Sequence, residues 1–209
     1  LRSKDSDGSG FSSSYLNDGT GVFTSNGELA DGLGSADFGD LDGDGDVDLF
    51  EGSLSSGFEH HPNSVFLNDG SADFVELTGA LPAHATPLDA APVLGDIEGD
   101  GDLDAYVPTS SSTAPLLFLY VNDGTAHFSD QPERISNRIY GQFVDLDVDG
   151  DVDVLGNGLL VNDGRGSFED HSERIAPLQF VNGLFVNVDL DGDPDSITLR
   201  GLARHLESL

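Results

Sequence analysis

Short runs of apolar residues, separated by polar turns, recur along this 209-residue chain. Four of the runs end in Asn-Asp-Gly, and a phenylalanine stands six residues after each asparagine; these asparagines are Asn17, Asn68, Asn122 and Asn162. Residues that tolerate positive φ, as Asn, Asp and Gly do, are typical of the turn in a β-hairpin. Helical periodicity is scarce between the runs. The pattern therefore predicts an all-β fold.

A second motif, rich in aspartate, alternates strictly with these hairpin turns. Its first copy reads D-L-D-G-D-G-D-V-D, and the four copies, named loops I to IV, cover residues 40–48, 96–104, 145–153 and 187–195. Each copy runs into another strand-like stretch, such as V-D-L-F or L-D-A-Y-V. Successive copies start 56, 49 and 42 residues apart. A unit of this length with about four strands has the size of a β-propeller blade.

We therefore expect a single domain over residues 1–209, built as a β-propeller-like array of about four four-stranded blades. A half-blade at 11–36 precedes the first Asp-rich loop, and a tail at 197–209 follows the last. A second half-blade, with the last Asp-rich loop, is left over at the other end. An unpaired half-blade exposes backbone donors and acceptors, so we expect the two half-blades to pair with each other.

The Asp-rich loops need a positive partner. Two carboxylates about 5 Å apart at an effective dielectric near 20 repel each other by about 3 kcal/mol. Carboxylates at positions 1, 3, 5 and 9, glycine at position 6 and a carbonyl at position 7 can wrap oxygen ligands around one ion. Calcium accepts six to eight oxygens, whereas magnesium demands a tight octahedron and zinc prefers nitrogen or sulfur. The sequence predicts about four Ca²⁺ ions; a solvated acidic turn is the alternative.

Loop I also satisfies the EF-hand pattern, because Glu51 stands at position 12. The other loops have Val107, Gly156 and Thr198 there, and residues 47–53 have no helical character. A true EF-hand is therefore the weaker interpretation.

The charge of the chain limits its partners. There are 39 acidic and 8 basic residues, giving a formal net charge of −31. Nucleic acid and anionic membranes are poor partners for such a surface. No apolar run approaches the roughly 18 residues of a membrane span, yet Leu, Ile, Val and Phe are abundant enough for a core. The chain lacks cysteine, so it has no disulfide and no thiolate metal site.

Enzyme hypotheses find little support in the sequence. The six histidines are scattered without an evident nucleophile or metal-ligand spacing; they are His60, His61, His84, His127, His171 and His205. No glycine-rich phosphate cradle or serine-centred elbow is present. We expect a protein without catalytic residues.

Two stretches, A-D-F-G-D-L-D-G-D-G-D-V-D-L-F at 36–50 and F-L-N-D-G-S-A-D-F at 66–74, resemble the FG-GAP, or VCBS, repeats of integrin-alpha-like β-propellers. The resemblance covers nearly all of residues 11–199. It implies that each Asp-rich loop joins two adjacent strands of a blade and holds a structural Ca²⁺. The implied ligands are Asp40, Asp42, Asp44, Asp46 through its carbonyl, and Asp48; Asp96, Glu98, Asp100, Asp102 and Asp104; Asp145, Asp147, Asp149, Asp151 and Asp153; and Asn187, Asp189, Asp191, Asp193 and Asp195.

The chain also departs from the family pattern. Glu51, Gly52 and Ser53 replace its Gly-Ala-Pro, Glu98 is longer than the usual aspartate, and Asn187 removes one charge. Loops II and IV are therefore expected to bind calcium more weakly. The family usually closes with about seven blades, whereas four repeats are present, so this is a fragment or it closes differently.

The expected function is that of a calcium-stabilised structural or adhesive module. Calcium loops of this kind are filled at extracellular calcium levels, which predicts a secreted or cell-surface location. The alternative is the calcium-binding propeller portion of a larger secreted enzyme or carbohydrate-binding lectin. Sequence alone does not name a ligand, because function is not fixed by fold.

Self-association, or a protein or glycan ligand, is the expected kind of partnership. The two half-blades could pair in cis, giving a four-bladed ring, or in trans, giving a head-to-tail filament. Basic residues near the two ends could neutralise an acidic neighbour; they are Arg2, Lys4, Arg200 and Arg204. Leucines at helix-like spacing suggest a docking tail or a terminal helix packed on its own domain; they are Leu199, Leu202, Leu206 and Leu209.

Overall fold

The computed structural model describes most of the chain up to residue 175 and two strands beyond it. The described residues are 3–4, 10–31, 35–52, 54–56, 59–83, 91–108, 117–137, 139, 141–175, 183–186 and 195–198. They form antiparallel strands and two single-turn 3-10 helices, so the predicted all-β class is confirmed. None of the helices in these ranges has the length and apolar character required to cross a membrane.

Three four-stranded antiparallel sheets form the middle of the molecule. Sheet I consists of β4 (Ala36–Gly39), β5 (Asp48–Glu51), β8 (Ser64–Asn68) and β9 (Phe74–Glu76). Sheet II consists of β10 (Val93–Gly95), β11 (Asp104–Pro108), β12 (Leu117–Asn122) and β13 (Phe128–Asp130). Sheet III consists of β14 (Gly141–Val144), β15 (Asp153–Gly156), β16 (Leu159–Asn162) and β17 (Phe168–Asp170).

Each of these sheets repeats one connection pattern. An Asp-rich loop joins its first two strands, and an Asn-Asp-Gly turn joins its last two, as predicted. In sheet I a small hairpin, β6 (Leu54–Ser56) with β7 (Glu59–His61), is inserted before β8. Short 3-10 helices follow sheets II and III, namely η1 (Pro132–Arg134) and η2 (Ser172–Arg174). Loop I leads into strand β5 and not into a helix, which is inconsistent with an EF-hand.

Smaller sheets flank the three sheets. On the amino-terminal side, β1 (Ser3–Lys4), β2 (Gly10–Asn17) and β3 (Phe23–Asp31) form a three-stranded sheet whose β2–β3 turn carries the first Asn-Asp-Gly. On the carboxyl-terminal side, β18 (Gly183–Val186) pairs with β19 (Asp195–Thr198). Loop IV lies between these two strands. Residues 199–209, which contain the leucines of the expected tail, lie outside the described residues.

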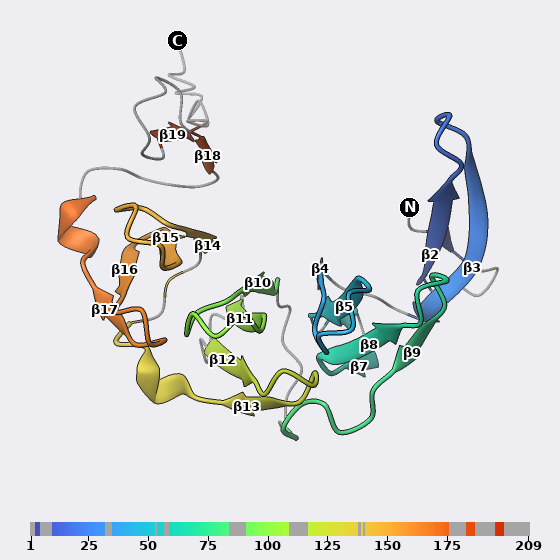
Figure 1. Ribbon diagram of the computed structural model, residues 1–209, viewed down its shortest axis with the longest axis horizontal. Helices are drawn as coiled ribbons and strands as arrows, with labels where there is room; N and C mark the ends of the chain where they lie inside the picture. Colours follow the sequence, from blue (N-terminus) through green and yellow to red (C-terminus); the bar gives the residue numbers. More distant parts are fainter. Residues whose placement is uncertain are drawn as a thin grey trace, which may run out of the picture.

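The sheets follow one another along an arc (Figure 1). The first strands of the three sheets lie next to each other: β10 of sheet II contacts both β4 of sheet I and β14 of sheet III. Close approach explains the glycine at the end of β10: a Cβ at Gly95 would lie 2.7 Å from Cδ2 of Phe143 in the next sheet. The three four-stranded sheets thus succeed one another in chain order, and the described residues do not close into a ring.

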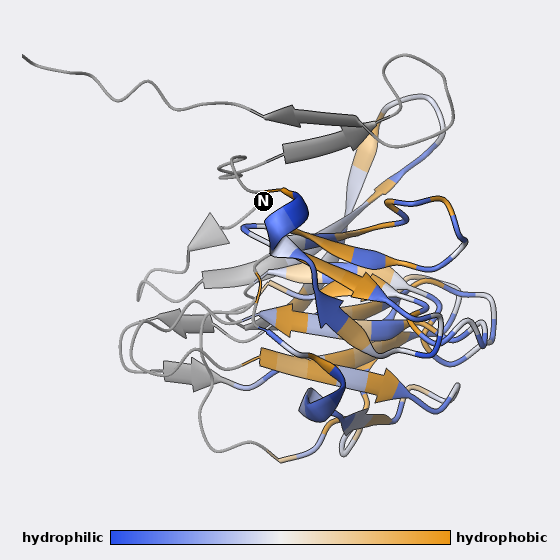
Figure 2. Cartoon of the chain, turned by 90° about the vertical axis from the view of Figure 1, so that its left-hand side faces the viewer, coloured by the Kyte–Doolittle hydropathy of each residue, from blue (hydrophilic) through white to orange (hydrophobic). Residues whose placement is uncertain are grey.

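The core lies between consecutive sheets, and sheet II is buried on both faces. Along β11, Ala105 and Val107 pack toward sheet I, whereas Tyr106 packs toward sheet III. This alternation follows from the two-residue period of a strand. Between sheets I and II, the rings of Phe50 and Phe128 meet edge to face with centroids 5.4 Å apart. Figure 2 shows hydrophobic residues concentrated in the strands and hydrophilic residues in the connecting loops.

Candidate metal centres

The first aspartate of each described Asp-rich loop organises the turn through backbone hydrogen bonds. In loop I, the carboxylate of Asp40 accepts the N–H groups of Gly43 and Gly45 at 2.9 and 3.0 Å. Asp96 of loop II accepts Gly99 and Gly101 in the same way, and Asp145 of loop III accepts Asp149 and Gly150. Gly45, at position 6, has φ of +93°, a conformation in which a Cβ is unfavourable. The repeated sequence thus produces one repeated loop conformation.

Loops I and III bring three carboxylates together. One carboxylate oxygen from each of Asp40, Asp42 and Asp44 lies within 4.8 Å of the others. Asp145, Asp147 and Asp149 form the corresponding cluster in loop III. These oxygen-only clusters fit a hard cation such as Ca²⁺ or Mg²⁺, and they provide neither the nitrogen nor the sulfur that zinc prefers. The residues present therefore fit a metal ion in both loops.

The electrostatics of the clusters also favour a cation. Burial, together with the charges of neighbouring carboxylates, raises the pKa of Asp42. Desolvation and the charges of Asp149, Asp145, Asp147 and Asp163 raise the pKa of Asp151 in loop III. A bound cation would stabilise the ionised carboxylates and offset both effects.

In loops I to III, the ninth residue has a structural role that the sequence did not indicate. Asp48, Asp104 and Asp153 are 0%, 1% and 1% exposed. The carboxylate of Asp48 accepts the N–H of Leu41, in its own loop, and that of Asn68, in the hairpin turn, both at 2.9 Å. Equivalent pairs of bonds occur at the other two aspartates. Their role as metal ligands stays a prediction.

In loops I to III, the seventh residue packs against the Asn-Asp-Gly turn of its own sheet. A Cβ at Gly70 would lie 2.7 Å from Oδ2 of Asp46, and one at Gly124 would lie 2.5 Å from Oδ2 of Asp102. Asp151 approaches Gly164 in the same manner. Glycine is favoured at this turn position because its φ is +71° to +79°, and because a Cβ would force the acidic side chain to shift. The predicted ligand at this position is a backbone carbonyl, which this side-chain packing does not test.

Loops I and II are also bound to the next sheet. The side-chain amide of Asn122, in sheet II, donates to the carbonyl of Leu41 in loop I at 2.8 Å. The N–H of Ala126 donates to the same carbonyl at 3.0 Å. One repeat later, Asn162 donates to the carbonyl of Ile97 in loop II at 2.8 Å. The conformation of each loop is therefore coupled to a sheet–sheet junction.

Loop II differs from loops I and III at its third position. There, Glu98 forms an ion pair with Arg134 of the 3-10 helix η1. The fourth loop cannot be compared, since Asn187, Asp189, Asp191 and Asp193 lie outside the described residues, and Asp195 is described only as the backbone start of β19. The predicted ligands of loops II and IV therefore stay predictions.

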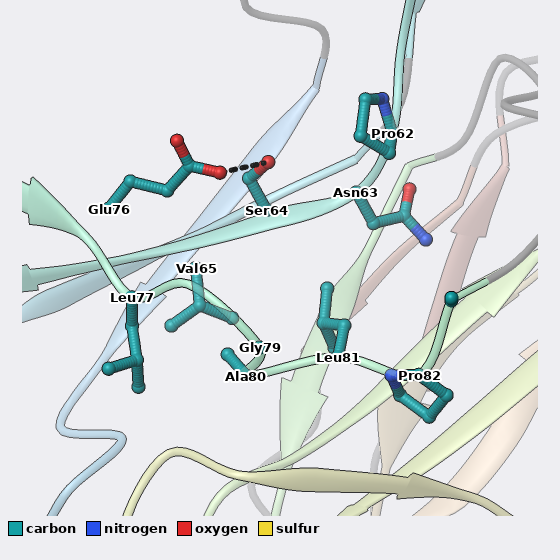
Figure 3. A pocket seen from close by; sticks show the side chains of 11 residues that line it. Pro62, Asn63, Ser64, Val65, Glu76, Leu77, Gly79, Ala80, Leu81 and Pro82 are labelled. Carbon is teal, nitrogen blue, oxygen red and sulfur yellow. Dashed lines mark hydrogen bonds between the residues drawn. The ribbon is translucent and has the colours of Figure 1, made fainter.

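A hollow of about 310 Å³ lies beside β8 and β9 of sheet I (Figure 3). Its lining contains one carboxylate, Glu76, which accepts a hydrogen bond from the hydroxyl of Ser64 at 3.4 Å. The lining residues include no histidine, cysteine, lysine or arginine. Elsewhere, His171 lies between Glu169 and Glu173, at 3.8 and 3.4 Å. We assign no reaction to either place.

Comparison with known protein families, curated proteins and solved structures gives no match.

Proposed function

We propose that this chain is a calcium-binding repeat module in which the ions stabilise the junctions between sheets. The observation that carries the proposal is the convergence of three carboxylates in loop I, a loop whose Leu41 carbonyl accepts two hydrogen bonds from sheet II. An ion that fixes loop I also fixes this acceptor. Metal binding is then linked to folding, because the unfolded chain contains no preformed site.

Calcium is the preferred ion on chemical grounds. The clusters offer carboxylate oxygens from a flexible, glycine-containing loop, and the seventh residue can add a carbonyl. Calcium tolerates six to eight such ligands in variable geometry, whereas magnesium requires a tight octahedron and dehydrates reluctantly. The affinity expected for such sites also supports an extracellular location, where calcium is abundant.

Calcium counting on single variants tests the assignment in loop I. Asp44→Ala removes a converging carboxylate and should reduce the number of bound ions by one. Asp46→Ala is the matched control, since Asp46 is proposed to act through its carbonyl, and it should retain the ion. Equal calcium numbers in the wild type and Asp44→Ala, measured by equilibrium dialysis, would contradict the assignment.

The architecture we propose is that of an FG-GAP/VCBS-type β-propeller. Four-stranded antiparallel sheets whose first strands lie side by side, each with an Asp-rich loop between its first two strands, support this proposal. The resemblance of residues 36–50 to that family supports it as well. A structural or adhesive role follows from this architecture, with the calcium-binding part of a larger secreted enzyme or lectin as the alternative.

Self-association is part of the proposal because the first hairpin exposes an apolar surface. Phe23, which stands six residues after its Asn-Asp-Gly asparagine, is 63% exposed, whereas the equivalent Phe128 and Phe168 are 7% and 4% exposed. The backbone at Phe128 and Phe168 is hydrogen-bonded by the segment that follows the preceding sheet. A similar segment, from the same chain or from a second copy, would cover Phe23.

Measuring molecular size in the presence of calcium tests the self-association. We expect the intact chain to form assemblies that become smaller when residues 197–209 are removed. A strictly monomeric intact chain would rule out pairing in trans and favour closure in cis.

A further inference from the structure

Loop II has a cation partner within the protein. Glu98, at its third position, is ion-paired with Nη1 of Arg134, and the two side chains are 24% and 25% exposed. The corresponding residues of loops I and III, Asp42 and Asp147, instead converge with the neighbouring carboxylates of their own loops. Glutamate is one methylene longer than aspartate, which extends its carboxylate away from the loop.

The position of Arg134 is fixed from several sides. It ends the 3-10 helix η1, which follows the last strand of sheet II. Its Nη1 also donates to the carbonyl of Arg165, in the Asn-Asp-Gly turn of sheet III, at 3.1 Å. A Cβ at Gly166 would lie only 2.6 Å from this nitrogen and 3.2 Å from Cγ of Glu98. The turn of sheet III therefore leaves the space that the Arg134–Glu98 pair occupies.

Among the three loops that the structure describes, this arrangement occurs only in loop II. In the segment after sheet I, the repeat position of Arg134 is taken by Ala80, which is buried in the core and carries no charge. In the segment after sheet III, that position is taken by Arg174, which is exposed. Loop III nevertheless retains its carboxylate cluster. Both the arginine and the longer glutamate thus accompany the change in loop II.

The Arg134–Glu98 ion pair changes the set of carboxylate ligands that loop II can offer to a metal ion. A calcium ion at loop II would need the carboxylate of Glu98 to leave the guanidinium, or would bind with one ligand fewer. It would also be repelled by the positive charge of Arg134, because two cations a few ångströms apart interact unfavourably even in a polar environment. The remaining carboxylates, among them Asp96 and Asp100, accept backbone N–H groups as Asp40 and Asp44 do in loop I, so loop II differs in its third residue.

We propose that Arg134 is the resident cation of loop II, so that this loop keeps its fold without calcium and binds calcium much more weakly than loops I and III. The inference rests on the proposed calcium function of the other loops. It divides the junctions into two classes: the junction of sheets I and II depends on calcium, whereas the junction of sheets II and III is held by Arg134.

Calcium counting distinguishes this inference from its alternatives. Free calcium is fixed at the plateau of the wild-type binding isotherm. Asp100→Asn, in loop II, should then leave the number of bound ions unchanged, whereas Asp44→Asn, in loop I, should remove one. The double variant Glu98→Asp/Arg134→Gln should gain one ion, and the matched control Arg174→Gln should gain none.

The possible outcomes distinguish the role of Arg134 from the proposed calcium function. Loss of an ion in Asp100→Asn, or no gain in the double variant, would overturn the role of Arg134 while leaving calcium binding at loops I and III intact. No bound calcium in the wild type would instead refute the proposed function itself.

A second readout does not involve calcium binding. In metal-stripped protein, Arg134→Gln removes the cation that holds loop II and should lower the melting temperature by about 3–6 °C. Arg174→Gln, on an exposed side chain, should shift it by less than about 1 °C. Equal melting temperatures for wild type and Arg134→Gln would overturn the inference.

Discussion

Raising the pH of the metal-stripped protein from about 5 to about 7.5 should lower its stability, because Asp104 is buried. The Asp104 side chain is 1% exposed, and its carboxylate accepts the N–H groups of Ile97 and Asn122 at 3.0 and 2.8 Å. Burial is the main cause that raises the pKa of Asp104 from 3.8 to about 7, with the charges of Glu98 and Asp100 acting in the same direction. The folded state thus holds a proton that the unfolded state releases.

The sign and size of the effect follow from this difference. The contribution of Asp104 is fully present below pH 3.8 and is lost as the pH rises through about 7. The shift corresponds to at most about 4 kcal/mol of unfolding free energy. Between pH 5 and 7.5 about 2.5 kcal/mol of this is lost, because part of the contribution has already disappeared between pH 3.8 and 5. For a chain of this length, each kcal/mol moves the melting temperature by about 2–4 °C, so a decrease of about 5–10 °C is expected. Burial also raises the pKa of Asp153, which adds to the decrease.

Other aspartates do not cancel this trend within the same pH window. Hydrogen bonds from neighbouring hydroxyl and backbone groups lower the pKa of Asp18, Asp69, Asp123 and Asp170. Their contributions are present above pH 3.8 and are lost only at lower pH. Calcium should reverse the trend, because its carboxylate ligands must be ionised and binding strengthens as the pH rises.

Thermal unfolding followed by circular dichroism, on protein stripped with a chelating resin, measures the effect. Asp104→Asn is the matched control, since it has no proton to release and should flatten the pH dependence. A melting temperature that stays constant or increases between pH 5 and 7.5 in metal-free wild type would refute the reasoning.

Two further predictions concern packing and backbone strain. Phe128→Ala should lower the unfolding free energy by about 3–5 kcal/mol. Phe38→Ala, on a side chain that is 56% exposed in β4, should change it by less than about 1 kcal/mol; equal effects in urea denaturation would contradict the assigned core. Val148→Gly should raise the stability by up to about 1 kcal/mol, because Val148 has φ of +61° where loop I has Gly43. A loss of stability in Val148→Gly would show that the valine is not strained.

The hairpin turns and the Asp-rich loops could be predicted because each depends on residues close together in the sequence. Asn-Asp-Gly supplies its own positive-φ residues, and Asp40 organises loop I through bonds that span three and five residues. The all-β class followed from these local signals, and so did the strand after each loop. Local motifs of this kind specify their conformation before any long-range contact is formed.

The contacts that join the sheets could not be predicted. Asn122 donates to Leu41 across 81 residues, and Arg134 pairs with Glu98 across 36. Neither partner is marked by local spacing, because the link exists only once one sheet is stacked on the next. The buried role of Asp48 was missed for a related reason: a carboxylate in an acidic loop indicates a metal ligand, whereas its two backbone partners are revealed only by the fold.

The melting temperature of the full chain with and without calcium tests the central claim most directly. Saturation of loops I and III, at a calcium concentration of about 100 times the dissociation constant, should stabilise the fold by about 5 kcal/mol in total. That corresponds to a rise of about 10–20 °C over the EDTA-treated protein, and magnesium should restore the rise poorly. The same melting temperature in EDTA and in calcium would contradict the account, because the acidic loops would then hold the sheets together without the ion.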